Sequence, residues 1–225
     1  GEVGERPFLD VSSRVRADAE TGLFSIAFPP EFAKKQHLYA MYVNQEGAVT
    51  VARYRVTEDP DVADGESEEV LLEVANDLGQ HNGGTIAFSP VDGMLYVSIG
   101  DGGIGVEEDG TYTDDPRRSG QNGGTLLGKM LRIDVEGGEA PYGVPAGNPR
   151  KEGWLPEIWS MGHRNLQGAA LHPETGALWT VEHGARGGDE LNQPQAGRNY
   201  GWPVISYGRE YSMASPASSP SSGRI

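Results

Sequence analysis

The sequence predicts an all-β protein built from repeated four-stranded antiparallel sheets, arranged radially as the blades of a β-propeller. Its 225 residues include 33 glycines and 15 prolines, and 36% of them are hydrophobic, a composition typical of many short strands joined by tight turns. A pair of apolar segments recurs three times along the chain, and no long helical pattern interrupts the repeats. These observations favour short sheets over a helical bundle.

Each copy of the repeat has an apolar segment that ends near a proline, then a turn, and then a second segment carrying Leu-Tyr or Leu-Trp. The copies are residues 23–30 with 37–43, residues 85–90 with 94–99, and residues 169–173 with 177–181. Short apolar segments bounded by turn residues are typical of strands. The repeat therefore predicts one similar hairpin in each of three blades.

Further strand candidates lie between the copies, at residues 49–56, 69–74, 129–135, 157–160 and 204–207. Four strands per sheet then define blade-like units at residues 23–74, 85–160 and 168–207, within a partial propeller domain covering residues 1–211. Residues 7–11 form a lone outer strand. Because closed propellers usually need about four to eight blades, we expect an open arc. The Ser/Pro-rich tail, residues 212–225, is expected to be disordered.

The formal net charge of −15 argues against a nucleic-acid partner, because no basic face is available to displace counterions from phosphates. The sequence has no cysteine, which excludes disulfides and thiolate metal sites. It has no pattern of a signal peptide and no apolar run that predicts membrane insertion. Gly1 is not a natural start, so we expect the chain to begin within a longer protein.

The segment 182–203, EHGARGGDELNQPQAGRNYGWP, combines glycines and carboxylates in a single strand-loop-strand. Its glycines allow positive φ angles and a close backbone approach to a ligand. Asp189 and Glu190 follow them with hard oxygen ligands, which suit a cation. The alternative is a surface loop whose acids are only solvated.

Two motifs place polar side chains immediately before predicted innermost strands. His81 lies in GQHNGG, where an imidazole suits proton transfer near neutral pH. Arg164 and Asn165 lie in MGHRNLQG, and their fixed donors suit an oxyanion or a carboxylate-bearing ligand. By repeat position the three residues face the same axis. Their alternatives are a structural histidine and a capped turn between blades.

Asp101, in IGDGG, has three possible roles: a turn residue, a carboxylate that lines the pocket, or part of a cation site. QNGGTLLGKMLRID is not a phosphate-binding loop, because the GxxxxGK[ST] spacing is absent. His172 lies beside a hairpin turn on the expected outer side. His37 and His163 have no partner that the sequence identifies.

Together these motifs resemble the glucose/sorbosone dehydrogenase family. TGLFSIAFPPEF, HNGGTIAFSP with LYVSIGDGG, LLGKMLRIDVEG, EIWSMGHRNLQG and the segment 182–208 occur in the order typical of that family. The sequence is similar to its soluble aldose sugar dehydrogenases, which use pyrroloquinoline quinone (PQQ), and the similarity covers residues 7–211. It implies a six-bladed propeller with cofactor and sugar at the axis. The three units would be the second to fourth blades, and residues 7–11 the outermost strand of the first.

The resemblance also implies roles for the polar residues at the axis. His81 matches the general base that takes the proton of the anomeric hydroxyl while hydride passes to the quinone. Arg164 and Asn165 match donors to the cofactor. Glu20 stands where some relatives use Gln to contact the cofactor, and its carboxylate would repel an anionic quinone. Gln80 replaces an acidic neighbour of the base and, with Asp101, is a candidate for substrate contact.

Two calcium sites follow from the same resemblance. Gly184 and Ala185 match the pair whose backbone carbonyls bind the cofactor-linked Ca²⁺, although Ala185 replaces the usual proline. Asp189, Glu190 and the carbonyl of Tyr200 match a second, structural Ca²⁺ site. Basic residues that hold the cofactor's carboxylates in the family belong to later blades, which lie beyond this sequence.

The resemblance implies PQQ- and calcium-dependent oxidation of aldose sugars to lactones, with electrons passed to an unidentified acceptor, in a periplasmic or secreted protein. Two other function classes stay open. One is a non-catalytic interaction module, because hedgehog-interacting proteins resemble the same family. The other is a calcium-dependent hydrolase of the lactonase type, which predicts side-chain carboxylates on the central metal. His81 together with Arg164 and Asn165 favours the dehydrogenase.

Overall fold

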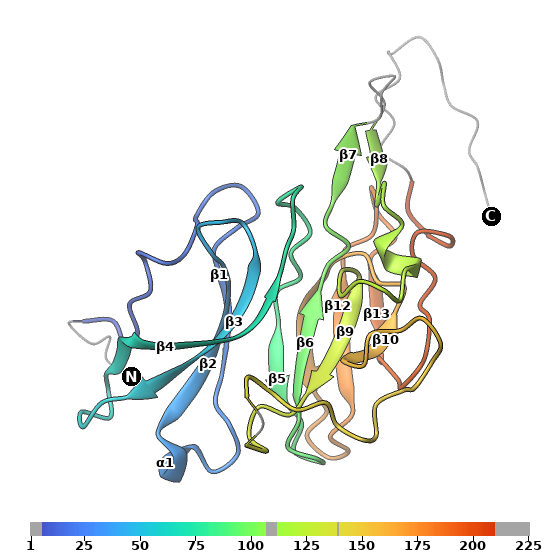
Figure 1. Cartoon of the computed structure of the whole chain (residues 1–225). Helices are drawn as coiled ribbons and strands as arrows, with labels where there is room; N and C mark the ends of the chain where they lie inside the picture. The colour runs from blue at the N-terminus through green and yellow to red at the C-terminus, as the bar shows by residue number, and fades with distance from the viewer. Residues whose placement is uncertain (1–5, 107–111, 139, 210–225) are drawn as a thin grey trace.

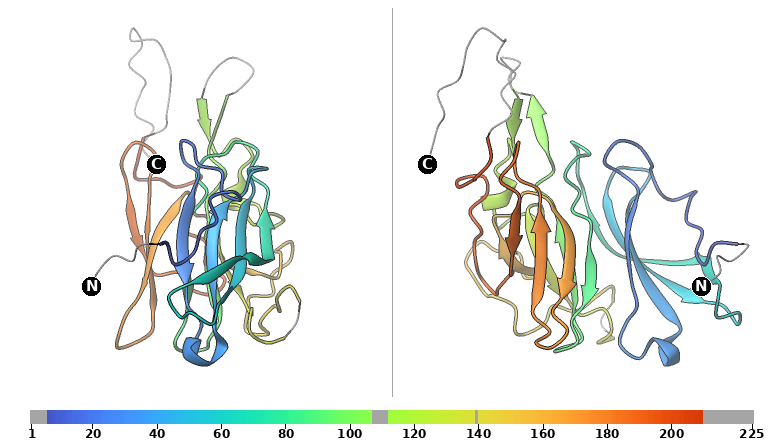
Figure 2. Two further views of the ribbon diagram at one scale, coloured as in Figure 1. Left: turned by 90° about the vertical axis from the view of Figure 1, so that its left-hand side faces the viewer. Right: turned by 180° about the vertical axis from the view of Figure 1, so that it is seen from behind.

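The computed structural model describes residues 6–106, 112–138 and 140–209. Antiparallel sheets follow one another in chain order and stand side by side as an open arc, the arrangement of successive propeller blades (Figures 1 and 2). The predicted all-β class and its antiparallel four-stranded sheets are confirmed. Within the described ranges, no helix has the length and apolar character that a membrane span requires.

The first sheet is a simple meander of four strands, with the helix α1 (Phe32–Lys35) between its first two. Its strands are β1 (Leu23–Ala27), β2 (His37–Val43), β3 (Val49–Val56) and β4 (Ala63–Val74). β4 begins earlier than the predicted segment 69–74. One face of this sheet packs on the second sheet, and the other is covered by the segment around Phe8 and Val11.

The second sheet has the order β10-β9-β6-β5. Its strands are β5 (Ile86–Phe88), β6 (Leu95–Ile99), β9 (Lys129–Ile133) and β10 (Ile158–Met161). Between β6 and β9 the chain inserts the hairpin β7 (Ile104–Val106) with β8 (Tyr112–Asp114), and then the 3-10 turn η1 (Ser119–Gln121). The hairpin of β7 and β8 projects beyond the end of the sheet (Figure 1).

The third sheet has three described strands in the order β11-β12-β13: β11 (Leu166–Leu171), β12 (Leu178–Glu182) and β13 (Glu190–Asn192). The prediction of a strand at residues 204–207 is wrong, and β13 takes the third place. The backbone N–H groups of Val204 and Ile205 both donate to the carbonyl of Gly201, at 2.8 and 2.9 Å, which closes a turn. Those groups are therefore not available to a sheet ladder.

The lone outer strand predicted at residues 7–11 is also absent. Phe8 accepts one ladder-like bond from the N–H of Ala63, at 2.6 Å. Immediately afterwards the Asp10 carboxylate accepts the N–H of Ser12 at 2.9 Å, and the chain turns. The predicted disordered tail lies at residues 212–225, outside the described residues.

The inner strands of the three sheets are neighbours: β5 lies beside both β1 and β11. A large apolar core fills the space between the first and second sheets, and a smaller one around Tyr96, Met130 and Leu166 joins the second to the third. Burial of these side chains, at roughly 25 cal/mol per Å² of apolar area, fixes the sheets face to face. The loops that precede β5 and β11 therefore meet at the same end of their sheets.

Candidate functional site

His81 lies in the loop before β5, where its side chain is almost fully buried and its φ angle is +45°. A Cβ atom on Gly100, which follows β6, would lie 1.9 Å from the carbonyl oxygen of His81. Only glycine therefore allows the two backbones to approach this closely. The loop of His81 and the end of β6 form one wall of the site.

Asp101 contacts His81 directly. Its Oδ1 lies 2.7 Å from Nδ1 of His81 and accepts the N–H of Gly103 at 2.8 Å, while its Oδ2 accepts the indole N–H of Trp202 at 2.7 Å. Burial raises the pKa of Asp101, and the hydrogen bond with His81 acts in the opposite direction. Because Nδ1 faces the carboxylate, Nε2 is the nitrogen of His81 that would accept a proton from a substrate. The sequence left Asp101 as a turn residue, a pocket-lining carboxylate or part of a cation site. The structure shows a contact that none of these anticipated, a buried carboxylate against Nδ1 of His81.

Arg164 lies just before β11 and is held from several sides. Its Nη2 donates to Asp114 at 2.9 Å, Nη1 donates to the carbonyl of His183 at 3.3 Å, and the guanidinium lies over the ring of Trp202. Its carbonyl accepts the N–H of Asp101 at 2.8 Å. Arg164 and His81 therefore share Asp101 as a neighbour, Trp202 contacts both Asp101 and Arg164, and the structure brings the two predicted motifs together.

Asn165 links the same two motifs. Its side-chain oxygen accepts the N–H of Gly83 at 3.1 Å, and its backbone carbonyl accepts the N–H of His183 at 3.1 Å. The amide oxygen thus faces the protein. Nδ2 is the part of Asn165 that is able to donate to a ligand.

Glu20 and Gln80 brace the His81 loop. The Glu20 carboxylate accepts the backbone N–H of His81 at 2.8 Å, and its carbonyl accepts the side chain of Asn82 at 2.9 Å. Gln80 packs against Gly103, where an added Cβ would lie 2.5 Å from the Cβ of Gln80. The structure therefore gives both residues contacts to the loops beside His81.

The glycine-rich loop after β12 is tightly packed. A Cβ on Gly184 would lie 2.3 Å from the carbonyl oxygen of Gly187, and the N–H of Gly184 donates to Asp189 at 3.1 Å. Ala185 is buried, and its carbonyl accepts the N–H of Arg209 at 2.7 Å. The residues proposed for the cofactor-linked cation thus lie in a defined backbone arrangement.

The residues predicted for a second cation are less closely gathered. The Asp189 side chain is 66% exposed, and the Glu190 carboxylate accepts the amide of Asn192 at 2.8 Å. The Tyr200 hydroxyl donates to the carbonyl of Gln193 at 2.5 Å. The described residues hold no cluster of three or more His, Cys, Asp or Glu side chains suited to a metal. A cation here would need backbone carbonyls in addition to the carboxylates of Asp189 and Glu190.

Several buried polar residues beneath the site were not predicted. His163 is fully buried between Ser160, 2.8 Å from its Nε2, and Glu182, 3.0 Å from its Nδ1, and its ring stacks on Tyr200. Glu182 also accepts the backbone N–H of Arg164. The alternation of buried and exposed residues along β12 points Glu182 inward, and a period of two in LWTVE is the signal that could have found it.

His37 likewise has a partner in the structure, since its Nε2 lies 2.8 Å from Glu136. The contact joins the start of β2 to the segment after β9. Lys35, the last residue of α1, also pairs with Glu136, at 2.6 Å. This histidine therefore has a structural contact away from His81.

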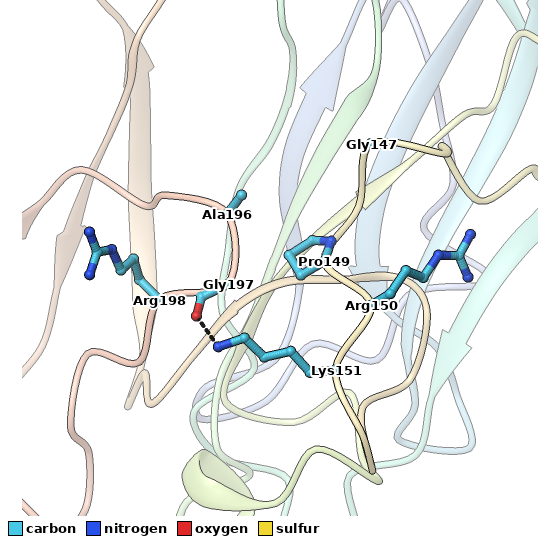
Figure 3. A pocket seen from close by; sticks show the side chains of 7 residues that line it. All are labelled: Gly147, Pro149, Arg150, Lys151, Ala196, Gly197 and Arg198. Carbon is cyan, nitrogen blue, oxygen red and sulfur yellow. Dashed lines mark hydrogen bonds between the residues drawn. The ribbon is translucent and has the colours of Figure 1, made fainter.

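Two hollows among the described residues bear on the site. A cavity of about 80 Å³ adjoins the site and is lined by Tyr112, Thr113, Asp114, Ala185, Trp202, Pro203, Ser206 and Gly208. A wider, open pocket of about 510 Å³ is lined by residues of the segments 147–151 and 196–198 (Figure 3). There Lys151 reaches the carbonyl of Gly197, while Arg150 and Arg198 point away from each other. The smaller cavity lies next to the site, because Asp114 and Trp202 in its lining contact Arg164 and Asp101.

The chain is similar to known proteins along nearly its whole length. The model of the Glucose / Sorbosone dehydrogenase family matches residues 2–223. An uncharacterized protein of Synechocystis sp. is 43% identical over 208 residues, covering 89% of this chain and 47% of that protein. The aldose sugar dehydrogenase YliI of Escherichia coli (strain K12) is 33% identical over 204 residues, covering 88% of this chain and 50% of YliI.

Among solved structures, the PQQ-bound form of aldose sugar dehydrogenase from Streptomyces coelicolor superposes with a TM-score of 0.69 at 31% identity. The match covers 88% of this chain and 53% of that one. The chain therefore spans about half the length of the curated relatives it matches.

Proposed function

The chain belongs to the glucose/sorbosone dehydrogenase family, and on that premise we propose that it forms part of a PQQ-dependent oxidoreductase that oxidises aldose sugars. The observation that carries the proposal is the buried contact between His81 and Asp101, with Arg164 beside it. This arrangement supplies a base, a group that orients the base, and a fixed cation within one polar network.

The base in this proposal is Nε2 of His81. It takes the proton of the sugar's anomeric hydroxyl, and Asp101 stabilises the imidazolium that forms, because its carboxylate lies against Nδ1. The Glu20 carboxylate and the glycine at position 100 fix the backbone on which the imidazole is carried. Trp202 holds the second oxygen of Asp101 and keeps the carboxylate in place.

When bound, PQQ supplies the quinone that takes up the hydride, so that the aldose leaves as a lactone. The donors present fit such a group: the Arg164 guanidinium and the Nδ2 of Asn165 both donate, and both suit oxygens that gain negative charge. Asp114 holds Arg164 at 2.9 Å and fixes the direction of the guanidinium. Gln80 remains a candidate for contact with the sugar, whereas the Asp101 carboxylate, also predicted for that role, is buried and bonded to His81, Gly103 and Trp202.

Calcium belongs to the same proposal. The carbonyl oxygens of Gly184 and Ala185 are hard donors that suit Ca²⁺, and the Ala185 oxygen has a second lone pair beside the one that faces Arg209. Asp189, Glu190 and the carbonyl of Tyr200 are proposed for a structural Ca²⁺. We further propose a periplasmic or secreted location for the protein, and an electron acceptor that reoxidises the cofactor.

The test is aldose-dependent reduction of a dye by the purified protein with PQQ and Ca²⁺, beside a version extended to all six blades. We expect His81→Ala in the active form to abolish turnover and leave PQQ bound, because the base is lost and the donors remain. His172→Ala is the matched control, since His172 is an exposed histidine on the hairpin that follows β11, and should keep full activity. Inactivity of both lengths would refute the dehydrogenase, and unchanged turnover in His81→Ala would refute the base.

A further inference from the structure

Lys129 is a fully buried lysine at the start of β9. Its ammonium donates to the carbonyls of Ser119 and Leu127, each at 2.6 Å. Burial lowers the pKa of Lys129 to about 7, although the nearby carboxylates of Asp115 and Asp101 act in the opposite direction. A buried ammonium is costly unless its donors are satisfied. Here both bonds go to backbone, and one of them holds the first residue of η1.

Asp115 holds the same turn from its other side. Its Oδ1 accepts the N–H of Ser119 at 2.6 Å, and its Oδ2 accepts the N–H of Gly120 at 2.9 Å. Ser119 therefore has its N–H bound by a carboxylate and its carbonyl bound by an ammonium. Hydrogen bonds to charged groups are about twice as strong as neutral ones. We call Lys129 and Asp115 the η1 clamp.

The turn lies directly against Trp202. A Cβ on Gly120 would lie 2.6 Å from the carbonyl oxygen of Trp202 and 3.0 Å from its Cδ1. The side chain of Gln121 donates to the same carbonyl at 2.6 Å. Because packing at this contact leaves no room for a methyl group, a shift of η1 must shift Trp202.

Trp202 in turn holds the carboxylate that faces the proposed base. Its Nε1 donates to Oδ2 of Asp101 at 2.7 Å, and Oδ1 of Asp101 lies 2.7 Å from Nδ1 of His81. We propose that Lys129 and Asp115 are positioning residues, which fix η1, hold Trp202 against Asp101, and thereby orient His81. The catalytic consequence rests on the proposed function, whereas the link from η1 to Trp202 does not.

A matched pair of variants separates this role from general stability. Lys129→Met removes the ammonium and keeps a long side chain. Arg132→Met is the control, because Arg132 is a buried cation on the same strand that pairs instead with Asp92 and Asn148. Asp115→Asn tests the other half of the clamp in case Lys129→Met does not fold.

The first measurement needs no activity. The indole N–H resonance of Trp202, assigned by its loss in Trp202→Phe, reports the bond to Asp101 in the purified protein. We expect it to move in Lys129→Met and in Asp115→Asn, and to stay in place in Arg132→Met. An unmoved resonance in both clamp variants would overturn the proposal.

The second measurement is a double-mutant cycle on sugar oxidation. Small displacements at an active site can cost about a hundredfold in rate, so we expect Lys129→Met and Trp202→Phe each to lower kcat by about tenfold or more, with KM nearly unchanged. Combined, they should lower kcat no further than the stronger single change, because both act through Asp101. A loss of kcat in the double variant equal to the product of the two single losses would contradict the inference. If the wild type oxidises no aldose, the proposed function fails. The indole resonance then decides by itself whether η1 positions Trp202.

Discussion

Asp101 is the carboxylate that contacts His81 and would stabilise its imidazolium. It is 3% exposed, it faces Nδ1 of His81, and it accepts the indole of Trp202. Asp101→Asn keeps the shape of the side chain and removes the charge that would stabilise an imidazolium. We expect kcat for aldose oxidation to fall by about a hundredfold to ten-thousandfold, the range for a disabled general base, with the affinity for PQQ nearly unchanged.

Steady-state dye reduction measures the loss in Asp101→Asn, and a PQQ titration measures binding. Asp92→Asn is the control, because Asp92 pairs with Arg132 away from the site at 2.9 Å. It removes one carboxylate from the same chain and should keep kcat. A kcat for Asp101→Asn equal to that of the wild type would show that Asp101 does not assist His81.

The site residues that lie in sequence motifs were predicted, whereas those that reach the site from distant parts of the chain were not. His81, Arg164 and Asn165 each precede an inner strand, so their repeat position predicted a common location. Asp114 belongs to a hairpin inserted between β6 and β9, and Trp202 meets Asp101 across 101 positions in sequence. No local period links such residues, so only the folded chain reveals them.

Among the elements, η1 is held by two buried titrating groups, Asp115 before it and Lys129 on β9, whose pKa values are shifted in opposite directions. Burial raises the pKa of Asp115 to about 6 and lowers that of Lys129 to about 7. Between about pH 4 and pH 6 the folded chain binds more protons at Asp115 than the unfolded chain, so this residue makes stability fall as pH rises. Between about pH 7 and pH 10.5 the unfolded chain keeps a proton on Lys129 that the folded chain has lost, so stability rises with pH.

The pH dependence gives a prediction for Lys129→Met. The wild type should gain stability relative to this variant as pH rises from about 7 to about 10, because only the wild type has the titrating group. Thermal unfolding of both proteins across this range measures the difference in Tm. The Tm of Arg132→Met should change with pH in parallel with that of the wild type. A constant difference between Lys129→Met and the wild type would mean that Lys129 keeps its ordinary pKa when folded.

Strands were predicted well where apolar residues recur and poorly where glycine and proline dominate. All strands of the first two sheets fall within or overlap predicted segments, apart from the inserted β7 and β8. In the third sheet the apolar residues 204–207 suggested a strand, but the turn closed on Gly201 uses the N–H groups of Val204 and Ile205. β13 has only three residues beside a glycine-rich loop, which is too short for a period of two to be recognised.

At the scale of the whole molecule, the net charge of −15 opposes the compact state through self-repulsion. Added NaCl should therefore raise the thermal stability by screening. A bound cation would act in addition, through mass action on the folded state alone. The two effects are separable because screening depends on ionic strength, whereas binding depends on the size and ligand preference of the ion.

We expect Ca²⁺ to raise Tm more than Mg²⁺ at equal ionic strength, because the carbonyl and carboxylate donors of the loop at residues 184–190 suit the larger ion and Mg²⁺ gives up its water reluctantly. At a Ca²⁺ concentration about 100 times the Kd, the gain is about 2.7 kcal/mol. Differential scanning calorimetry measures it. Asp189→Asn with Glu190→Gln should lower the excess of Ca²⁺ over Mg²⁺, because it removes the carboxylates of the structural site, while Glu46→Gln with Glu58→Gln changes the net charge equally at exposed positions and should keep it. Equal effects of the two ions on the wild type would contradict calcium binding in this part of the protein.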